Sequence, residues 1–399
     1  MSTLAPLVLK KDEDRRLRTG HTWIFSNEVD TAKTPLTAFE PGQPVLLQAH
    51  NGKPLGTGFV NPHSLICARL VSRDPEYHLT KSLLVHRLQI ALSLRERLYP
   101  EPYYRLAFGD SDGLPGLVVD RYGAVCVVQI SAAGMERVKD DIVAALEKVL
   151  HPECIIFRND SGMRELEGLS AYTEVAVGNA PAMLDITENN VKFHAPTQDG
   201  QKTGWFYDHR ANRRRMQEYV RGQNVLDVFS YVGGWGIQAA AAGATSVSCI
   251  DSSQSALDVL KDNAALNQTQ DRVQAICGDA FDVLKSLRAD KQHFDVIVLD
   301  PPAFVRRKKD LAAGTEAYQR LNQAAMQLLS RDGILISASC SSYVTRDSLR
   351  GVLLSTSRHV DRTLQIIEQG HQAPDHPVHP AIPETDYLKA FFCRVLPTQ

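Results

Sequence analysis

Hydrophobic positions follow their most regular pattern in the second half of the chain, where short apolar runs alternate with stretches of helical periodicity. Strand-length runs separated by helix-length segments are typical of a parallel, doubly wound sheet, so we expect an α/β domain there. The predicted strands are Val225–Phe229, Ser246–Asp251, Val273–Cys277, Phe294–Asp300, Ile334–Ser339, Arg362–Glu368 and Tyr387–Leu396, and the predicted helices are Gly236–Ala242, Ser253–Asn267, Ala280–Leu287 and Glu316–Leu329.

The first half of the chain combines shorter elements. Residues 1–72 contain strand-like runs between turn residues, and the Asn51-Gly52 pair is typical of a hairpin, which predicts a small β-rich domain. Residues 73–182 begin with leucines at helical spacing between Leu79 and Leu98 and continue with strands and one more helix, over Gly134–Leu150. We therefore expect a small α+β domain at 73–182 and the α/β domain at 183–399.

Charge and composition narrow the class of protein. The 399 residues include 44 Lys plus Arg and 46 Asp plus Glu, a formal net charge of −2, so any contact with nucleic acid must use local patches. One basic cluster lies near the N-terminus, and the acids interspersed with it, Asp12, Glu13 and Asp14, fit a solvated turn equally well. The candidate RNA-binding residues are Lys10, Lys11, Arg15, Arg16 and Arg18.

Two further features concern location and cysteine chemistry. No apolar run approaches the roughly 18 residues of a membrane helix, and the N-terminus lacks a signal-peptide pattern, so we expect a cytoplasmic protein without a membrane partner. The seven cysteines are an odd number and form no C-x-x-C pair, which argues against a disulfide framework and against a zinc site. We expect no metal, and most cysteines should be buried.

A glycine-rich turn follows the first predicted strand of the α/β domain. Asp227 lies on the strand, and Gly233, Gly234 and Gly236 precede the next helix. Such a turn lets the backbone approach a ligand and directs a helix N-terminus at it, which favours a nucleoside cofactor. The strict G-x-G-x-x-G spacing is absent.

Three more acids follow strands in order. Asp251 can accept hydrogen bonds from ribose hydroxyls, Asp279 can meet an adenine amino group, and Asp300 opens the segment D-P-P-A-F. Each acid alone fits a helix cap equally well. Four strand ends with an acid in succession favour a cofactor site.

The segments D-x-F-x-x-x-G-G-x-G and D-P-P-A-F, together with Asp251 and Asp279, resemble a class I S-adenosylmethionine-dependent methyltransferase. The remaining segments narrow this resemblance to the large-subunit (23S) ribosomal RNA cytosine-C5 methyltransferase family of RlmI type, from about Leu9 to Val395. They are Lys202–Arg210, Ser111–Gly116 with Asp120–Gly123, Trp23–Ser26, Ala338–Ser341 and Asp375–Val378.

The resemblance implies a PUA domain at the N-terminus, a middle domain of strands and a helix, and a C-terminal methyltransferase domain. It also implies S-adenosylmethionine as the cofactor and ribosomal RNA as the substrate, and it allows a homodimer. The resemblance and the residues at the strand ends together indicate the expected cofactor-binding residues. These are Lys202, Thr203, Gly204, Asp208, Arg210, Asp227, Phe229, Ser230, Gly233, Gly234, Asp251, Ser252, Asp279, Ala280 and Asp300.

The chain departs from this family's pattern at two positions. His209 stands where Gln is usual, and Ala303 stands where some members have Lys. We expect neither residue to touch the chemistry, although either can shift the substrate preference.

Cys340 and Asp300 are the candidate catalytic residues. C5 of a pyrimidine is too weak a nucleophile to attack a sulfonium methyl, but a thiolate that adds at C6 gives C5 enamine character. Cys340 follows the fifth strand, at the edge where open α/β sheets place their sites. Asp300 is expected to face the N3/N4 edge of the base, hydrogen-bonded or protonated. No residue is assigned as the base that removes the C5 proton.

Three alternative functions stay open on the sequence. D-P-P also suits enzymes that methylate exocyclic amines, in which case Cys340 is a bystander. Uridine C5 methylation uses the same thiol chemistry. A non-enzymatic RNA-binding protein with a vestigial cofactor pocket is the third, although the intact acids at four strand ends argue against it.

Overall fold

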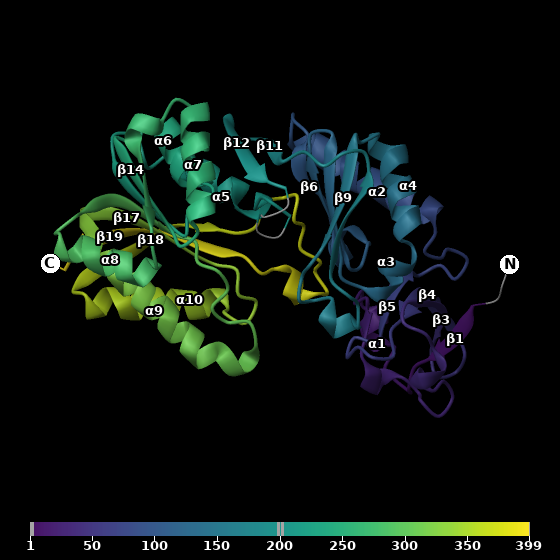
Figure 1. Ribbon diagram of the computed structural model, residues 1–399. Helices are drawn as coiled ribbons and strands as arrows, with labels where there is room; N and C mark the ends of the chain where they lie inside the picture. Colours follow the sequence, from purple (N-terminus) through teal and green to yellow (C-terminus); the bar gives the residue numbers. More distant parts are fainter. Residues whose placement is uncertain (1–3, 198–199, 201–202, 399) are drawn as a thin grey trace. The chain divides into compact units, whose positions relative to one another are not determined.

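The computed structural model describes residues 4–197, 200 and 203–398. It divides into two compact units (Figure 1). The first unit comprises Met1–Leu184, Pro196–Trp205 and Pro374–Thr385, and the second comprises Asp185–Ala195, Phe206–Ala373 and Asp386–Gln399. Within the described ranges, no helix combines the length and the hydropathy that a membrane span needs.

The second unit is built on a seven-stranded sheet, and the predicted doubly wound α/β fold is confirmed. The first five strands are parallel. The last strand of the chain pairs antiparallel with the fifth, and the sixth strand pairs antiparallel with the last, so only the last strand runs against the others. In spatial order the strands are β15 (Val273–Cys277), β14 (Ser246–Asp251), β13 (Asn224–Val228), β16 (Phe294–Leu299), β17 (Leu329–Ser339), β19 (Lys389–Pro397) and β18 (Arg362–Gly370).

Helices cover both faces of this sheet (Figure 1). Helices α6 (Gly236–Ala241) and α7 (Gln254–Leu266) lie on one face, and α8 (Ala280–Ala289), α9 (Leu311–Leu328) and α10 (Arg346–His359) lie on the other. Strand side chains alternate between the faces, so Leu226 and Val228 pack into the core under α8–α10, whereas Asp227 points toward α6. This alternation places one carboxylate inside an otherwise apolar strand.

The strand order determines where a ligand can bind. The chain leaves β13 toward β14 on one side, and it later returns to place β16 on the other side of β13. Adjacent crossovers therefore diverge at the carboxyl ends of β13 and β16, which opens a crevice at that edge. All four predicted acids lie at or near this edge.

Two helices and one two-stranded hairpin of the α/β part were not predicted. They are helix α5 (Arg210–Met216), helix α10 and the hairpin of β11 (Met183–Glu188) and β12 (Val191–Pro196). Helix α10 carries many polar residues on its exposed face, and its buried positions are few, among them Leu349, Val352 and Leu353. A mostly polar helix gives a weak hydrophobic signal.

The first unit contains two five-stranded sheets. One has the order β1 (Ala5–Val8), β3 (Gln43–Gln48), β4 (Pro54–Val60), β5 (Ala68–Ser72), β2 (Trp23–Ile24), and the short helix α1 (Arg15–Arg18) lies in the same segment. The other has the order β10 (Tyr172–Val177), β9 (Cys154–Asn159), β8 (Val125–Ile130), β7 (Leu117–Tyr122), β6 (Tyr103–Phe108). Helices α2 (Lys81–Leu98) and α4 (Lys139–Leu150) contribute to the core of the second sheet, and α3 (Ala133–Arg137) precedes α4.

The expected β-rich and α+β segments are thus confirmed as folds, while the boundaries at 72 and 182 stay predictions. Polar contacts join the two sheets of this unit. Glu167 accepts hydrogen bonds from Asn61 at 2.8 Å and Arg69 at 3.0 Å, and Asp110 accepts one from the Trp23 indole at 2.9 Å. Because Glu167 is 4 % exposed, its two contacts are largely shielded from solvent.

Candidate active site at the carboxyl edge of the seven-stranded sheet

The turn after β13 has an unusual backbone that Asp227 stabilises. Phe229 and Tyr231 adopt positive φ angles of 69° and 49°, a conformation that side chains other than glycine rarely take. Asp227 Oδ2 accepts a 2.8 Å hydrogen bond from the amide of Gly236, which is the first residue of α6. The carboxylate of β13 therefore fixes the start of the helix across the turn.

Two glycines of this turn are required by their surroundings. Gly233 has a φ of +93°, and a Cβ there would lie 2.7 Å from a side-chain carbon of Ile237. A Cβ on Gly236 would lie 2.4 Å from Cys249 Sγ. Both contacts are shorter than atoms in folded proteins tolerate, so the turn can approach β14 and α7 only without side chains.

Buried polar atoms in this turn lack partners within the described part of the chain. Asp227 Oδ1 and Ser230 Oγ are both buried and make no hydrogen bond there. Burial, together with the nearby carboxylates of Asp300 and Asp251, raises the pKa of Asp227 to about 7 against the hydrogen bond from Gly236. An unsatisfied carboxylate oxygen and an unsatisfied hydroxyl are suited to a ligand that carries donors, such as the methionine part of S-adenosylmethionine.

Asp251 ends β14, and both of its carboxylate oxygens face backbone amides. Oδ2 accepts a 2.8 Å hydrogen bond from Tyr231, and Oδ1 accepts one at 2.9 Å from Ser253. Asp251 therefore links the glycine-rich turn to the start of α7, and each of its oxygens retains a lone pair for a hydroxyl donor. The neighbouring Ser252 is exposed.

Asp279 is the N-cap of α8. Its Oδ1 accepts hydrogen bonds from Phe281 at 2.9 Å and Asp282 at 3.3 Å, and Ala280 is buried behind it. The helix-cap interpretation, which the sequence left open for each acid, thus applies to Asp279. Its exposed side chain leaves Oδ2 for a ligand.

Asp300 follows β16 and is held by two side chains that the sequence did not connect with it. His209 Nε2 lies 3.1 Å from Oδ1, and the Trp235 indole donates to Oδ2 at 3.0 Å. Burial alone would raise the pKa of Asp300, but the charge and hydrogen bond of His209 and the hydrogen bond of Trp235 hold it below its ordinary value. Asp300 is therefore ionised, which argues against the protonated carboxyl considered above.

This contact corrects one expectation. We expected His209 to lie away from the chemistry, yet it bonds directly to a candidate catalytic carboxylate. Its ring also packs against the Trp235 ring at a centroid distance of 5.2 Å. The departure from the family's Gln thus falls within the site.

Cys340 follows β17, next to the strand that carries Asp300. The two flanking serines anchor it, because Ser339 donates to the Tyr318 hydroxyl at 2.9 Å and Ser341 Oγ lies 3.2 Å from the same hydroxyl. The amide of Val305, in the loop after Asp300, donates to Ser341 Oγ at 3.3 Å. The loops after β16 and β17 are therefore connected.

The other cysteines are less suited to act as nucleophiles. Five of them, Cys67, Cys126, Cys154, Cys249 and Cys393, are buried, and burial raises the pKa of each thiol, to about 12 for Cys67, Cys126 and Cys393. Cys277 is exposed but ends the edge strand β15, which is three strand positions from β16, roughly 14 Å. Cys340 is half-buried and lies one strand from Asp300.

Four side chains of this site are not indicated by the sequence motifs, namely His209, Trp235, Tyr318 and Lys389. Each comes from an element distant in the chain from its partner, so spacing carries no signal for it. The Lys389 ammonium donates to the carbonyl of Ser341 at 2.6 Å. The sequence offers one indication of this contact: Lys389 is a charged residue in a run of apolar residues that predicts a buried strand, and a lysine is rarely buried unless it is paired.

The predicted K-T-G segment belongs to the first unit, whereas the residues that follow it from Phe206 belong to the second unit. Lys202 lies outside the described residues. Thr203 is buried in the first unit, where its hydroxyl donates to Asp120 at 2.5 Å and its carbonyl accepts from Tyr122 at 3.2 Å. Gly204 has a φ of +112°. Two of the family-like segments, D-R-Y-G and K-T-G, are thus in contact.

Asp208 and Arg210, in the second unit, make contacts within the protein. Tyr387 donates to Asp208 Oδ2 at 2.5 Å, and Arg210 lies 3.6 Å from the buried carboxylate of Glu188. Both residues are buried. These contacts give them a role in positioning the segment around His209, and their role toward a cofactor stays a prediction.

The N-terminal basic cluster is largely paired with acids. Arg15 bonds Asp12 at 3.0 Å, Arg16 bonds Glu28 at 2.9 Å and Arg18 bonds Asp14 at 2.6 Å. Lys10 donates to the Asn27 carbonyl at 2.7 Å, and Lys11 is exposed. Three of the five cations of this cluster are therefore already paired with a carboxylate.

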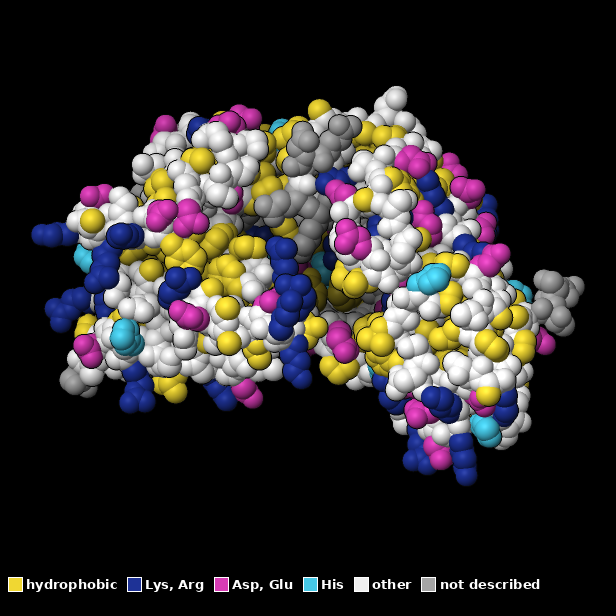
Figure 2. Space-filling model, turned by 60° about the horizontal axis from the view of Figure 1, so that its bottom comes forward, with side chains coloured by type: hydrophobic (Ala, Val, Ile, Leu, Met, Phe, Trp, Pro, Cys, Tyr) yellow, Lys and Arg dark blue, Asp and Glu magenta, His cyan; other side chains and the backbone are white. Residues whose placement is uncertain are grey.

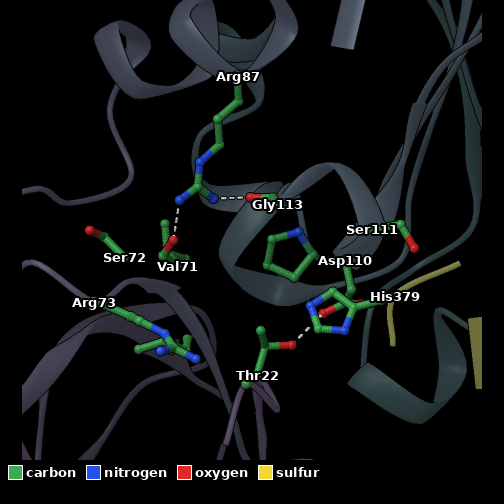
Figure 3. Close-up of a pocket in the computed structure, with 12 residues that line it drawn as sticks. Thr22, Val71, Ser72, Arg73, Arg87, Asp110, Ser111, Gly113 and His379 are labelled. Atoms are coloured by element: carbon green, nitrogen blue, oxygen red, sulfur yellow. Dashed lines mark hydrogen bonds between the residues drawn. The ribbon is translucent and has the colours of Figure 1, made fainter. Parts of the chain in front are cut away.

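A polar pocket of about 350 Å³ lies beside this cluster, within the first unit (Figure 3). Arg87 donates to the carbonyls of Val71 and Gly113, and Arg73 donates to the Leu17 carbonyl at 3.2 Å. Neither arginine forms an ion pair with a carboxylate among the described residues. Asp110 in the same pocket accepts from Thr22 at 3.0 Å. His379 also lines the pocket.

Charge over the surface is mixed. On the face drawn in Figure 2, Lys and Arg side chains occur in small groups with Asp and Glu side chains among them. This agrees with the near-neutral net charge, so uncompensated local groups such as Arg73 and Arg87 matter most for an anionic partner. Within the described ranges, no group of three His, Cys, Asp or Glu side chains has a metal-binding arrangement.

Comparison with known proteins identifies the family. A model of the S-adenosylmethionine-dependent methyltransferases matches residues 168–394, and a model of PUA-like domains matches residues 7–73. The chain is 37% identical over 396 residues to ribosomal RNA large subunit methyltransferase I of Shigella boydii serotype 18, which covers 98% of this chain and 99% of that protein. The protein of that name from Escherichia coli O157:H7 gives the same identity and coverage.

Solved structures support the same fold. A SAM-dependent methyltransferase from Streptococcus mutans superimposes with a TM-score of 0.82 at 21% identity, over 98% of this chain and 100% of that chain. A methyltransferase complexed with SAH gives a TM-score of 0.84 with the same identity and coverage. The resemblance inferred from the motifs is confirmed, and the chain belongs to the family of S-adenosylmethionine-dependent methyltransferases that includes ribosomal RNA large subunit methyltransferase I.

Proposed function

We propose that the protein methylates C5 of a cytosine in large-subunit ribosomal RNA. The observation that carries this proposal is the position of Asp300 and Cys340 after the neighbouring parallel strands β16 and β17. An ionised carboxylate and a half-buried thiol at the carboxyl edge can engage two different parts of one pyrimidine. The relatives named above supply the class of RNA.

The turn after β13 supports the cofactor assignment. Asp227 and Ser230 offer the unsatisfied atoms, Gly233 the close backbone, and Asp251 and Asp279 the lone pairs for ribose and adenine. Gly234 follows Gly233 in the same turn. Phe229, Ser252 and Ala280 flank these acids. When bound, S-adenosylmethionine supplies an electrophilic methyl group for the activated carbon.

Cys340 activates the base. The thiol loses its proton to solvent, and the thiolate adds to C6 of the cytosine, so a C–S bond forms and the C5–C6 double bond is consumed. C5 then carries the electron density of an enamine and can form a bond to carbon. After C5 has been alkylated, loss of the C5 proton restores the double bond and expels the thiolate.

Asp300 supports cytosine over uracil. As an ionised carboxylate it only accepts hydrogen bonds, and the exocyclic N4 amino group of cytosine is a donor. Uracil presents an O4 acceptor at that position, which would face the carboxylate unfavourably. His209 and Trp235 hold both oxygens in place, so the carboxylate is pre-organised before the base arrives.

Contacts to RNA are proposed in the first unit. The candidates are the basic cluster predicted from the sequence, Lys10, Lys11, Arg15, Arg16 and Arg18, and the adjoining pocket with Arg73 and Arg87. Three of the five cluster residues already pair with acids, whereas both pocket arginines bond backbone carbonyls. Phosphates would therefore gain most from the pocket. A homodimer and a cytoplasmic location stay predictions.

The release of tritium from the base tests the proposal against its alternatives. Large-subunit RNA labelled with tritium at C5 of cytosine should release one tritium for each methyl group transferred, because C5 must lose its hydrogen. The same RNA labelled at C5 of uracil should release none. Methyl transfer without tritium release would indicate an exocyclic-amine methyltransferase, and release from uracil alone would indicate uridine C5 methylation. No methyl transfer to the RNA would favour a binding protein with a vestigial pocket.

A further inference from the structure

A buried lysine lies alongside the proposed nucleophile. Lys389 is the first residue of β19, and in the antiparallel pair with β17 it stands opposite Ser339. Its ammonium donates to the carbonyl of Ser341 at 2.6 Å and to that of Tyr387 at 2.9 Å. The side chain thus starts level with the residue before Cys340 and ends at the residue after it.

The ammonium has no carboxylate to balance it at close range. Lys389 is 4 % exposed, and no ion pair joins it to an acid in the part of the chain that the structure describes. The ionisable groups that act on it are Cys340, Asp386 and Arg346. A buried cation without a paired anion is costly, so the position of this lysine needs an explanation beyond packing.

We propose that the Lys389 ammonium stabilises the thiolate of Cys340 and is a positioning residue for the reaction. The inference rests on the proposed function, because only a nucleophilic role for Cys340 requires a thiolate. A cation beside a thiol favours its ionised form, and the buried cation gains the partner that it lacks in return. The thiol proton goes to solvent, and no bond forms between Lys389 and sulfur.

Two further observations agree with this role. Burial lowers the pKa of Lys389 to about 8, while the charge of Cys340 and that of Asp386 act to raise it, so the thiolate and the ammonium stabilise each other. Tyr318 anchors both flanking serines and is buried, which keeps the Cys340 segment fixed against β19. Arg346 opposes the ammonium but donates to the Gly370 carbonyl at 3.1 Å.

The pH dependence of Cys340 alkylation tests the inference without RNA or cofactor. In a Cys277→Ser background, the iodoacetamide reaction of Cys340 is followed by peptide mass spectrometry between about pH 5 and pH 10. The apparent pKa should lie below the ordinary value of about 8.5. In Lys389→Met it should rise by about one unit or more, and in Lys389→Arg it should stay near that of the parent protein. Lys261→Met, at an exposed site on α7, is the matched control and should not change it.

An apparent pKa at or above about 8.5 in the parent protein would overturn the inference even if no variant folds. The same apparent pKa in the parent protein and in folded Lys389→Met would also overturn it, since a lysine that only locks the Ser341 loop would leave the thiol unchanged. The proposed function fails separately, through the absence of tritium release. A lowered thiol pKa together with no C5 methylation would retain the Lys389–Cys340 pair and reject the reaction.

Discussion

His209 Nε2 lies 3.1 Å from Oδ1 of Asp300, and this contact holds the carboxylate ionised at the carboxyl edge of the sheet. The two residues come from separate segments, His209 from the turn before α5 and Asp300 from the end of β16. The pair therefore depends on the tertiary fold. It also gives the departure from the family's Gln a direct connection to the proposed chemistry.

Replacing His209 should weaken methyl transfer without weakening cofactor binding. His209→Ala removes a charge-assisted hydrogen bond worth about 1.5–3 kcal/mol, so kcat should fall by roughly ten- to a hundredfold. His209→Gln keeps a donor and should retain most of the activity. Steady-state kinetics and calorimetric titration with S-adenosylmethionine would measure the two effects. Equal losses of kcat and cofactor affinity in His209→Ala would mean that the contact shapes the whole site.

The pH profile of the same variant should change in a defined direction. His209 lowers the pKa of Asp300 against the effect of burial, so removing it raises that pKa. Because the proposed reaction needs the carboxylate, the acid limb of kcat/KM should move to higher pH in His209→Ala. The stability that the pair contributes is present above the unfolded pKa of the carboxyl and is lost as the pH falls through the folded value. An unmoved acid limb would disconnect Asp300 from the chemistry.

Asp227 should couple cofactor affinity to pH. Its pKa is raised to about 7, so the folded protein binds a proton there that the unfolded chain has lost, and stability should fall as the pH rises from about 4 to about 7. A cofactor that donates to Asp227 favours the ionised form. Its affinity should therefore increase with pH over this interval, by at most about tenfold per unit.

Asp227→Asn is the control for this prediction. The amide keeps the shape of the side chain but cannot ionise, so both pH dependences should disappear. Titration calorimetry at several pH values, with unfolding curves of the apoprotein, gives both slopes. A pH-dependent affinity that persists in Asp227→Asn would assign the effect to another group.

Substitutions at Asp251 and at Asp279 should differ in their effects on cofactor affinity and on the free energy of unfolding. Asp251→Ala removes an acceptor proposed for the ribose hydroxyls, and we expect the affinity for S-adenosylmethionine to fall by roughly tenfold or more. Asp279→Ala removes the N-cap of α8 and should cost about 0.5–2 kcal/mol of unfolding free energy in addition to any loss of affinity. Cofactor binding of wild-type strength in Asp251→Ala would remove the ribose assignment.

The salt dependence of RNA binding should locate the phosphate contacts. Arg73→Ala should weaken binding and reduce the slope of log K against log[salt] by about one, because one fewer phosphate is neutralised. Lys11→Ala combined with Arg15→Ala should also reduce the slope if the N-terminal cluster binds RNA. Lys261→Ala serves as the control, and cofactor affinity should be unchanged in all variants. A slope that the double variant leaves intact would identify the cluster as a solvated turn.

Much of the fold was predictable because hydrophobic periodicity reports buried faces directly. The five parallel strands of the second unit alternate with helices at nearly the predicted positions, and the Asn51-Gly52 turn joins β3 and β4. The helix α10 escaped detection because most of its residues are polar. The hairpin of β11 and β12 was also missed, although its buried side chains Leu184, Ile186, Val191 and Phe193 alternate with more exposed positions in a pattern that is typical of strands. Periodicity reports on burial, and it reports little on elements that are polar on most faces.

The site was predictable only in part, for a different reason. The acids at strand ends follow from topology, because parallel strands bring their carboxyl ends to one edge. Lys389 and His209 reach that edge from β19 and from the turn before α5, and no local spacing connects them with Cys340 or Asp300. Their positions depend on long-range pairing, such as the register of Ser339 with Lys389. The pattern of residues along a single sequence does not indicate which distant strands and turns pair with one another.

Covalent trapping tests the central claim, the attack of Cys340 on C6, most directly. RNA in which fluorine replaces the C5 hydrogen of the target cytosine cannot complete the final elimination. With S-adenosylmethionine present, the protein and its Cys277→Ala variant should form an RNA adduct that survives denaturing electrophoresis. Cys340→Ala should form none and should lose methyl transfer, yet bind S-adenosylmethionine normally. An adduct in Cys340→Ala, or methylation by it at a near wild-type rate, would contradict the account.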